Sequence, residues 1–255
     1  MILGESSKSR FYKSAIHPER WEIVRHRIYQ KRICDLGLKI KGSGLEPLIH
    51  QLKEEIETHD ILYMPNFYLT DTWGCPDRVP IIGIPFYLSS PVLGLIEKEQ
   101  TGELEDRRTI MQLLRHEAGH AINYAFRLWE LHEWKKVFGA FSKPYREAYH
   151  PNPWSRKFVR HIRSCSYGYT YAQKHPDDDF AETFAVWLTP RSGWRRKYRD
   201  WPALEKLKYV DRLMEQIRDQ KPVCKGGKRI LPLSELTMTL AEHYRNRFKK
   251  YGKTS

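Results

Sequence analysis

Apolar residues recur at helical spacing along most of this chain and divide it into a series of predicted helices. Side chains three and four positions apart are apolar in six segments, namely 17–37, 45–57, 103–138, 176–188, 201–220 and 233–252. Pro18 lies in the first turn expected for the first helix and Gly37 at its end, while Pro190 ends the fourth. The pattern predicts a mostly helical protein.

Two shorter stretches have the composition of β-strands. Residues 61–70 (ILYMPNFYLT) and 79–89 (VPIIGIPFYLS) are rich in Ile, Tyr and Phe, and both contain proline. Because proline cannot donate a ladder hydrogen bond, it favours the edge of a sheet. The expected fold class is therefore α+β, mostly helical with a small mixed sheet before the helix at 103–138. An edge strand of this kind can also bind an extended peptide as an added strand.

The helix predicted over 103–138 contains the motif HEAGH at residues 116–120. His116 and His120 lie four residues apart, so on a helix their side chains share a face and can bind one Zn²⁺. Glu117 is suited to accept a proton beside such a metal. Gly119 costs about 1 kcal/mol relative to alanine inside a helix, which suggests close packing against another backbone. Because HExxH also arises by chance, a third ligand is needed to support a metal site.

A third histidine is not easily found near the motif. In one class of zinc proteases it follows the second histidine by six residues, after a glycine, but Phe126 and Asn123 occupy those positions here. A DNA-associated protease family takes its third histidine from about the distance of His132. However, the sequence predicts no helix break before Gly139, and a continuous helix carries His132 about 18 Å beyond His120. His132 is therefore not expected at the metal.

A better candidate lies in the predicted helix 176–188. Its segment FAETFAVWL is apolar on nearly every side, which predicts a buried helix, and Glu182 is the only charge within it. Burying a lone carboxylate is costly unless it is paired or binds a metal. A salt bridge to one of the many arginines is the common alternative. With HEAGH upstream, Glu182 is predicted to be the third ligand.

The two motifs together resemble those of zinc-binding metallopeptidases of the gluzincin-like group. RHEAGHAINY (115–124) is followed by YAQKHPDDDFAETFA (171–185), and the family pattern is HExxH plus a helix reading H-P-x-[DE]-D-[FW]-A-E-T. The resemblance, which covers roughly residues 60–215, implies a zincin-like fold, one Zn²⁺ per chain with Glu182 as third ligand, and a peptide or protein substrate. We expect one domain over 1–255, with a helical extension (1–60), a catalytic core (61–215) and a basic helical segment (216–255).

Several further residues have candidate roles in such a site. Tyr171 matches a position where the family usually has tyrosine, and we expect it to donate a hydrogen bond to the developing oxyanion. Tyr167 and Tyr169 are alternatives on the same segment. Asp178 and Asp179 precede Glu182 by four and three residues, so they can either orient a ligand histidine or start the helix. His175 is more typical of a structural cap, and the loop-rich segment 142–168 is expected to border the cleft or cover it.

The charge of the chain suggests another partner. Lys and Arg number 44 against 31 Asp and Glu, which gives +13, and such proteins bind anionic partners, including nucleic acids. In the basic run RSGWRRKYRDW (191–201), Trp194 and Tyr198 could stack on bases while the arginines hold phosphates. More often such a run is a solvated surface. Four widely spaced cysteines argue against a zinc finger or a disulfide scaffold, and the lack of a signal or membrane segment predicts a cytoplasmic protein.

The leading hypothesis is a zinc metalloendopeptidase in which Glu117 is the general base. The alternatives are a nucleic-acid-associated protein with a structural metal, and a protease that acts on nucleic-acid-bound proteins. The sequence does not predict the oligomeric state.

Overall fold

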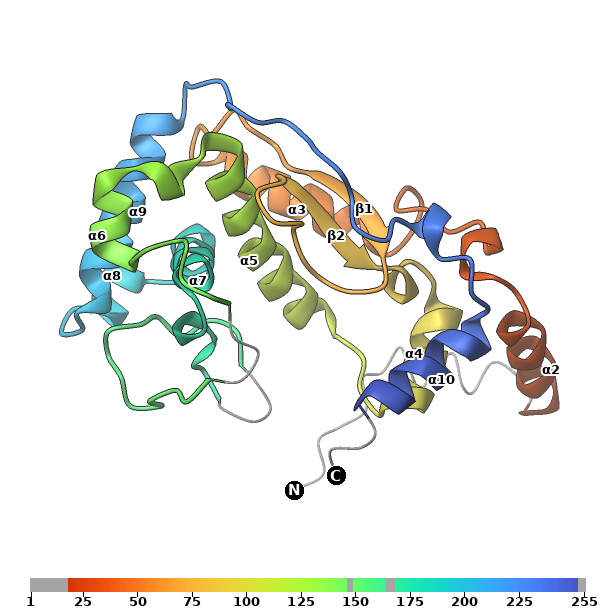
Figure 1. Ribbon diagram of the computed structural model, residues 1–255. Coiled ribbons are helices and arrows are strands. Elements are labelled where there is room, and N and C mark those ends of the chain that lie inside the picture. The colour runs from red at the N-terminus through yellow and green to blue at the C-terminus, as the bar shows by residue number, and fades with distance from the viewer. Residues whose placement is uncertain (1–17, 146–148, 164–167, 252–255) are drawn as a thin grey trace.

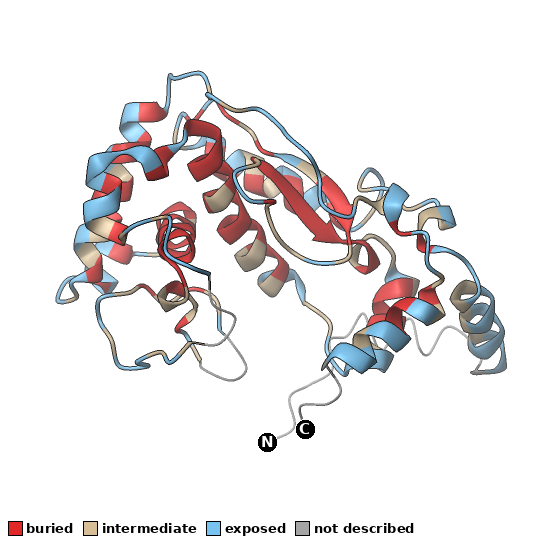
Figure 2. Ribbon diagram, in the orientation of Figure 1, coloured by how far each residue is buried: buried red, intermediate tan, exposed pale blue. Residues whose placement is uncertain are grey.

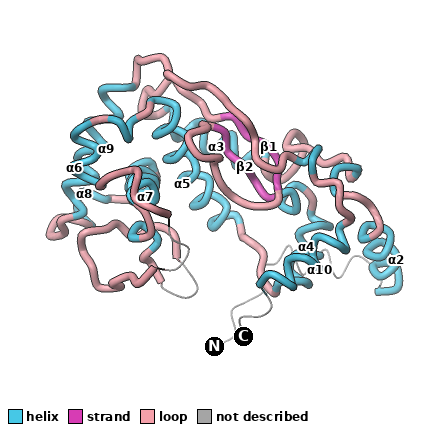
Figure 3. The backbone as a smooth tube through the Cα atoms, viewed as in Figure 1, coloured by secondary structure: helices cyan, strands magenta, loops and turns pink. Residues whose placement is uncertain are grey.

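Helices make up most of the computed structural model, which describes residues 18–145, 149–163 and 168–251 (Figures 1 and 3). In chain order the α-helices are α2 (Pro18–Tyr29), α3 (Glu46–Glu57), α4 (Pro91–Thr101), α5 (Arg107–Phe126), α6 (His132–Phe138), α7 (Pro176–Leu188), α8 (Trp194–Lys197), α9 (Ala203–Ile217) and α10 (Leu240–Tyr251). The strands are β1 (Asn66–Thr70) and β2 (Ile81–Pro85). The mostly helical α+β class predicted from the sequence is confirmed.

The sheet is smaller than its two predicted segments. β1 and β2 pair in parallel, with Asn66 opposite Ile81. On the other side of β2, Gly74 forms an antiparallel bridge with Gly83. The backbone N–H of Gly83 donates to the Gly74 oxygen at 2.8 Å, and Gly74 donates back at 3.3 Å. With two strands, β1 and β2 are both edge strands, as the prolines predicted, and the isolated bridge from Gly74 covers the free edge of β2 at Gly83 only.

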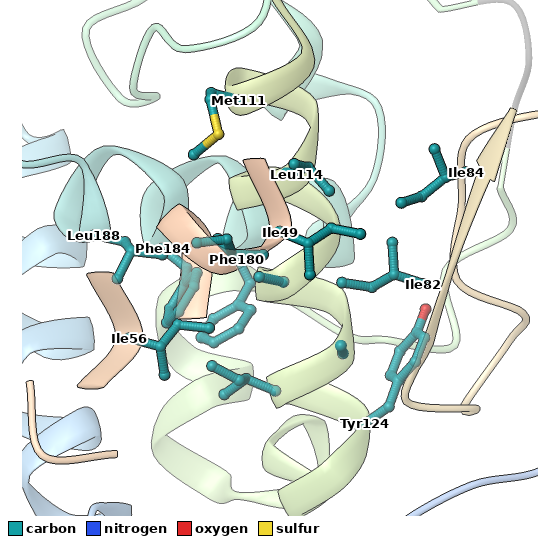
Figure 4. Close-up of a cluster of buried hydrophobic side chains, with 14 of the residues drawn as sticks. Ile49, Ile56, Ile82, Ile84, Met111, Leu114, Tyr124, Phe180, Phe184 and Leu188 are labelled. Carbon is teal, nitrogen blue, oxygen red and sulfur yellow. The ribbon is translucent and has the colours of Figure 1, made fainter. Parts of the chain in front are cut away.

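The hydrophobic core surrounds α5. Figure 4 shows Ile49 and Ile56 of α3, Ile82 and Ile84 of β2, and Phe180 of α7 directed towards this helix. Figure 2 shows that α5, α7 and the strands are largely buried, whereas α2 and α10 are largely exposed. The motif helix is thus held by apolar packing from several sides, which fixes the position of any side chain that it presents.

The long helix predicted over 103–138 is interrupted. α5 ends at Phe126, and Arg127 adopts the left-handed conformation with φ of 52°. A short 3₁₀ turn, Leu128–Glu130, follows before α6 begins at His132. Leu128 and Trp129 turn back into the core, where they are 2 % and 9 % exposed. Their burial stabilises a bend that no glycine or proline marks in the sequence.

Other parts of the helix prediction also differ from the structure. The first helix ends at Tyr29 and not at Gly37, and the last begins at Leu240, after a 3₁₀ turn at Leu233–Glu235. The helix α4 was not predicted. It begins at Pro91, a favoured first position, and ends at Thr101, and the φ of 78° at the following Gly102 suits a helix C-terminus. In the described part of the chain, no helix combines the length and apolar character needed to cross a bilayer.

α3 and α5 are joined by a buried ion pair. The guanidinium of Arg115 donates to both carboxylate oxygens of Glu55, each at 2.7 Å. Arg115 directly precedes His116, and its side chain reaches Glu55 of α3. This bidentate contact, together with apolar packing, opposes rotation of α5 about its axis.

The backbones of α5 and α7 approach each other closely at Gly119. A Cβ at this position would lie 2.7 Å from the Cα of Ala181 and 3.0 Å from its carbonyl oxygen. The absence of a side chain therefore lets the two helix backbones come together. The close packing expected from the glycine is confirmed.

Gly119→Ala should destabilise the protein, because α5 and α7 must move apart to accept the methyl group. We expect a loss of about 1–3 kcal/mol, typical of overpacking, even though alanine favours helix. Gly94→Ala is the matched control, since this helical glycine in α4 would place its Cβ no closer than 3.4 Å to a Leu104 methyl group. Thermal unfolding of both variants tests this, and equal melting temperatures would contradict it.

Candidate metal centre

Two buried helices contribute the polar side chains of the site. α5 presents His116, Glu117 and His120, and α7 presents its acidic residues from the opposite side. Four carboxylates of α7 are at most 5 % exposed, namely Asp177, Asp178, Asp179 and Glu182. Because buried carboxylates need partners, a helix that buries four of them is stable only when it packs against hydrogen-bond donors or a cation.

The inner nitrogen of each histidine is bound to a carboxylate of α7. Nδ1 of His116 lies 3.0 Å from Oε1 of Glu182, and Nδ1 of His120 lies 2.8 Å from Oδ2 of Asp177. Since carboxylates accept hydrogen bonds, each Nδ1 carries the donated proton. Burial favours the neutral form of His120, but the neighbouring carboxylates, first of all Asp177, together outweigh burial and raise the pKa of His120. In the neutral rings that a metal requires, both Nε2 atoms are left with a free lone pair.

These two Nε2 atoms face each other at 3.0 Å. Oδ1 of Asp178 lies 3.8 Å from Nε2 of His116 and 3.7 Å from Nε2 of His120. A tetrahedral Zn²⁺ with Zn–N distances of about 2.0–2.1 Å separates its ligand atoms by about 3.3 Å. His116, His120 and Asp178 therefore form a group that fits one metal ion in both spacing and chemistry.

Glu182 lies on the other side of His116. Its Oε1 is bound to Nδ1, across the imidazole from Nε2, and its Oε2 accepts the backbone N–H of Ile162 at 2.9 Å. Burial alone would raise the pKa of Glu182, but the hydrogen bond from His116, the nearby His161 and the Ile162 N–H together outweigh burial and lower the pKa. Asp178 is thus the better-placed third donor, and the ligand role of Glu182 stays a prediction.

Asp177 is the residue that the sequence analysis missed. Its Oδ2 accepts from Tyr124 at 2.6 Å and contacts His120, and its Oδ1 accepts from Asn123 at 2.7 Å. Burial raises the pKa of Asp177, yet the charge on His120 and these hydrogen bonds outweigh burial and lower it. In the sequence, the acidic residues 177–179 are explained by the start of a helix, so they gave no sign that Asp177 supports His120. The sequence feature that could have indicated this role is the pair Asn123 and Tyr124, two polar residues three and four positions after His120.

Glu117 and Tyr171 line the same cavity as the two histidines. Oε2 of Glu117 is buried and has no hydrogen-bond partner among the described residues, and burial raises the pKa of this carboxyl. The Tyr171 ring packs edge-on against His116 with centroids 5.4 Å apart, and burial raises its pKa, so it remains protonated. Of the alternative tyrosines, Tyr169 is 45 % exposed, and Tyr167 lies outside the described residues.

The site opens into a cavity of about 490 Å³. One wall is the segment 73–78, which follows β1 and includes the Gly74 bridge. The opposite wall includes Phe141, Ser142, Lys143 and Tyr145, so the start of the loop-rich segment does border the cleft. The Arg78 guanidinium lies 5.5 Å from the Phe141 ring centre and connects the two walls. The cavity therefore has room for a substrate in front of the histidines.

The remaining candidates have structural partners. His175 caps α7, since its Nδ1 accepts from the Asp177 backbone N–H at 3.1 Å while its Nε2 contacts the Lys143 oxygen at 2.8 Å. Asp179 pairs with Lys206 of α9, away from the histidines. His132 is exposed and does not belong to the possible metal-binding group found in the described chain. The helix break that could have redirected His132 is present, but it does not bring it to the site.

Two aromatic residues of the basic segment 191–201, Trp194 and Tyr198, are buried and do not offer their rings for stacking. Trp194 is 6 % exposed and Tyr198 is fully buried, so the expectation that they stack on bases is wrong. The Arg195 guanidinium covers Trp194 at 4.1 Å from the ring centre and pairs with Asp211 at 2.6 Å. A nucleic-acid partner stays a prediction from net charge alone.

Comparison with known families agrees with this geometry. Residues 96–193 match the model of a family described as "Putative zinc-binding metallo-peptidase". The resemblance to zinc-binding metallopeptidases is confirmed. The matched stretch contains α5 and α7 and therefore every donor of the metal centre. No curated protein and no solved structure matches the chain.

Asp177→Asn should weaken zinc binding by about 10- to 100-fold, as expected when the partner of a ligand histidine is lost. The amide cannot accept from His120, Tyr124 and Asn123 as the carboxylate does. Asp35→Asn is the control, since Asp35 pairs with Arg32 on the surface. Zinc titration against a competing chelator measures both variants, and an unchanged dissociation constant for Asp177→Asn would show that His120 needs no such support.

Proposed function

We propose that the protein is a zinc-dependent metalloendopeptidase in which His116, His120 and Asp178 hold one Zn²⁺. The observation that supports this most directly is the convergence of two Nε2 lone pairs and a carboxylate oxygen at 3.0–3.8 Å, next to an unpaired buried glutamate. Like charges and lone pairs at this distance repel unless a proton or a cation lies between them. The zinc-binding description of the matched family supports the cation.

The metal, when bound, supplies a Lewis acid that polarises the scissile carbonyl and acidifies a water molecule. Glu117 is the general base: it lines the cavity, and its carboxylate would accept a proton from a water molecule there and pass it to the leaving amine. Tyr171, protonated and against His116, donates a hydrogen bond to the oxyanion. Glu182 and Asp177 hold the two imidazoles in the tautomer that directs both Nε2 atoms to the metal.

The segment 73–75 is suited to bind the peptide backbone. Both backbone groups of Gly74 pair with Gly83, so those of Trp73 and Cys75 point away from β2. Trp73, Gly74 and Cys75 all line the cavity, and the Cys75 thiol contacts the Glu117 carbonyl oxygen at 3.5 Å. An extended substrate can therefore add itself as a strand beside the general base. This keeps the edge-strand hypothesis but moves it from β2 to the segment next to it.

The third ligand is tested by the zinc content of variants purified identically. Asp178→Asn should lose most of its zinc, whereas Glu182→Gln should keep about one zinc per chain when zinc is saturating, with a weaker dissociation constant. His132→Ala should match the wild type. Mass spectrometry of metal content measures all three. Zinc lost from Glu182→Gln but kept by Asp178→Asn would reverse the assignment and restore Glu182 as the ligand.

Glu117→Gln separates binding from chemistry. The amide retains the shape of the side chain but accepts no proton, so zinc content should be unchanged while hydrolysis of unfolded casein falls by at least about 100-fold. Removing zinc from the wild type with a chelator should have the same effect on hydrolysis, and adding zinc should restore it. Full turnover by zinc-loaded Glu117→Gln would remove Glu117 from the role of base.

A further inference from the structure

Trp73 forms a wall shared by two cavities. It lines the cavity of the metal centre and also a second cavity of about 440 Å³, bounded by Asp71, Thr72, Tyr87 and one side of α10. The Trp73 indole N–H donates to Glu105 at 3.2 Å, and the Tyr87 hydroxyl donates to the same carboxylate at 3.0 Å. These bonds hold the ring between the two spaces, so one extended molecule can contact both.

We propose that this second cavity is a substrate subsite, in which α10 binds the part of a polypeptide that runs past Trp73 away from the metal centre. The proposal rests on the peptidase function proposed above and adds the substrate class, an extended polypeptide. α10 lies outside the stretch that matches the family, so the subsite belongs to this chain and not to the family pattern.

His243 supplies the observation that points to a ligand. It lines the second cavity and is only 7 % exposed, yet its Nε2 has no hydrogen-bond partner within the described residues. Burial lowers its pKa to about 4, so the ring is neutral at physiological pH. Because Nε2 itself is buried, a bound molecule reaches it only when the His243 ring turns towards the cavity, and the new hydrogen bond then recovers the free energy that the unpartnered imidazole costs.

Other residues that line the second cavity hold α10 in place and give the cavity a polar lining. Arg247 donates to both oxygens of Glu97, at 2.8 and 3.0 Å, and Tyr244 donates to the same carboxylate at 2.9 Å. These contacts fix α10 to α4, so the charge of Arg247 is already compensated. The cavity then presents Asp71, Asn246 and His243, which offer hydrogen bonds of both kinds. Such a lining suits a peptide backbone with polar side chains better than a single apolar side chain.

The separation of the two cavities sets the length of substrate required. From Cys75, beside the general base, to Asp71, the chain spans at most about 13 Å. A substrate strand of about four residues covers the same distance. Peptides shorter than this on the relevant side of the scissile bond should lose the contacts with α10.

The test uses Asn246→Trp, which fills the second cavity from an exposed position, and Lys249→Trp, an exposed position on the same helix that lines neither cavity, as control. A bond cleaved in unfolded casein is first identified. Three peptides around this bond are then made. The short peptide has two residues on each side of the bond, and each longer peptide extends one of the two sides to six residues. We measure kcat/KM with zinc-loaded enzyme and, in the Glu117→Gln background, the dissociation constant of each peptide.

The proposal requires that one of the longer peptides is cleaved by the wild type at least about 10-fold more efficiently than the short one. Asn246→Trp should lose this gain and bind that peptide at least about 10-fold more weakly, while cleaving the short peptide normally. Lys249→Trp should retain the gain. Cleavage independent of length, or equal behaviour of the two variants, would overturn the subsite alone. If the zinc-loaded wild type cleaves neither casein nor any peptide, the peptidase function fails and the subsite fails with it.

Discussion

The contact between Gly119 and Ala181 is the constraint on which the site depends. The histidines project from α5 and their carboxylate partners from α7, so the separation of the two backbones sets every donor–acceptor distance between them. With a Cβ at position 119 the helices could not approach this closely, since it would lie 2.7 Å from the Ala181 Cα. Apolar packing around α5 then holds the pair together (Figure 4). The small residues between the two histidines are thus as important to the geometry as the histidines themselves.

The second constraint is electrostatic. α7 buries four carboxylates, and each is stabilised differently: Asp177 by His120, Tyr124 and Asn123, Glu182 by His116 and a backbone N–H, and Asp179 by Lys206. Asp178 is the exception, because its Oδ2 has no hydrogen-bond partner in the described chain and its Oδ1 lies nearly 4 Å from two imidazoles. A divalent cation compensates this charge better than any group nearby, which is why the site is more readily explained as a metal centre than as an ion-pair network.

Much of this arrangement could be predicted from the sequence, and the failures have physical causes. The helices that carry strong periodicity or a proline start, such as α3 and α7, were predicted correctly. The bend at Arg127 was not, because it results from the burial of Leu128 and Trp129 in tertiary structure and has no local signal. Helical spacing predicted that the two histidines of HEAGH share one face of α5, and their Nε2 atoms lie 3.0 Å apart. Spacing could not decide between Asp178 and Glu182, since both lie on one face of α7 and only the helix crossing shows which side of His116 each one meets.

The family pattern and the rest of the chain contribute different parts of the proposed enzyme. The matched stretch holds the metal donors and the general base, and these determine which bond chemistry is possible. The segment 73–78 and α10 lie outside that stretch, yet they line the metal cavity and the adjacent one. Glu55 also lies outside the matched stretch, and its bidentate hydrogen bond with Arg115 anchors the helix that bears the histidines. In the proposed enzyme, a substrate in the metal cavity would contact the segment 73–78, so its selection would depend on residues that the catalytic motifs do not include.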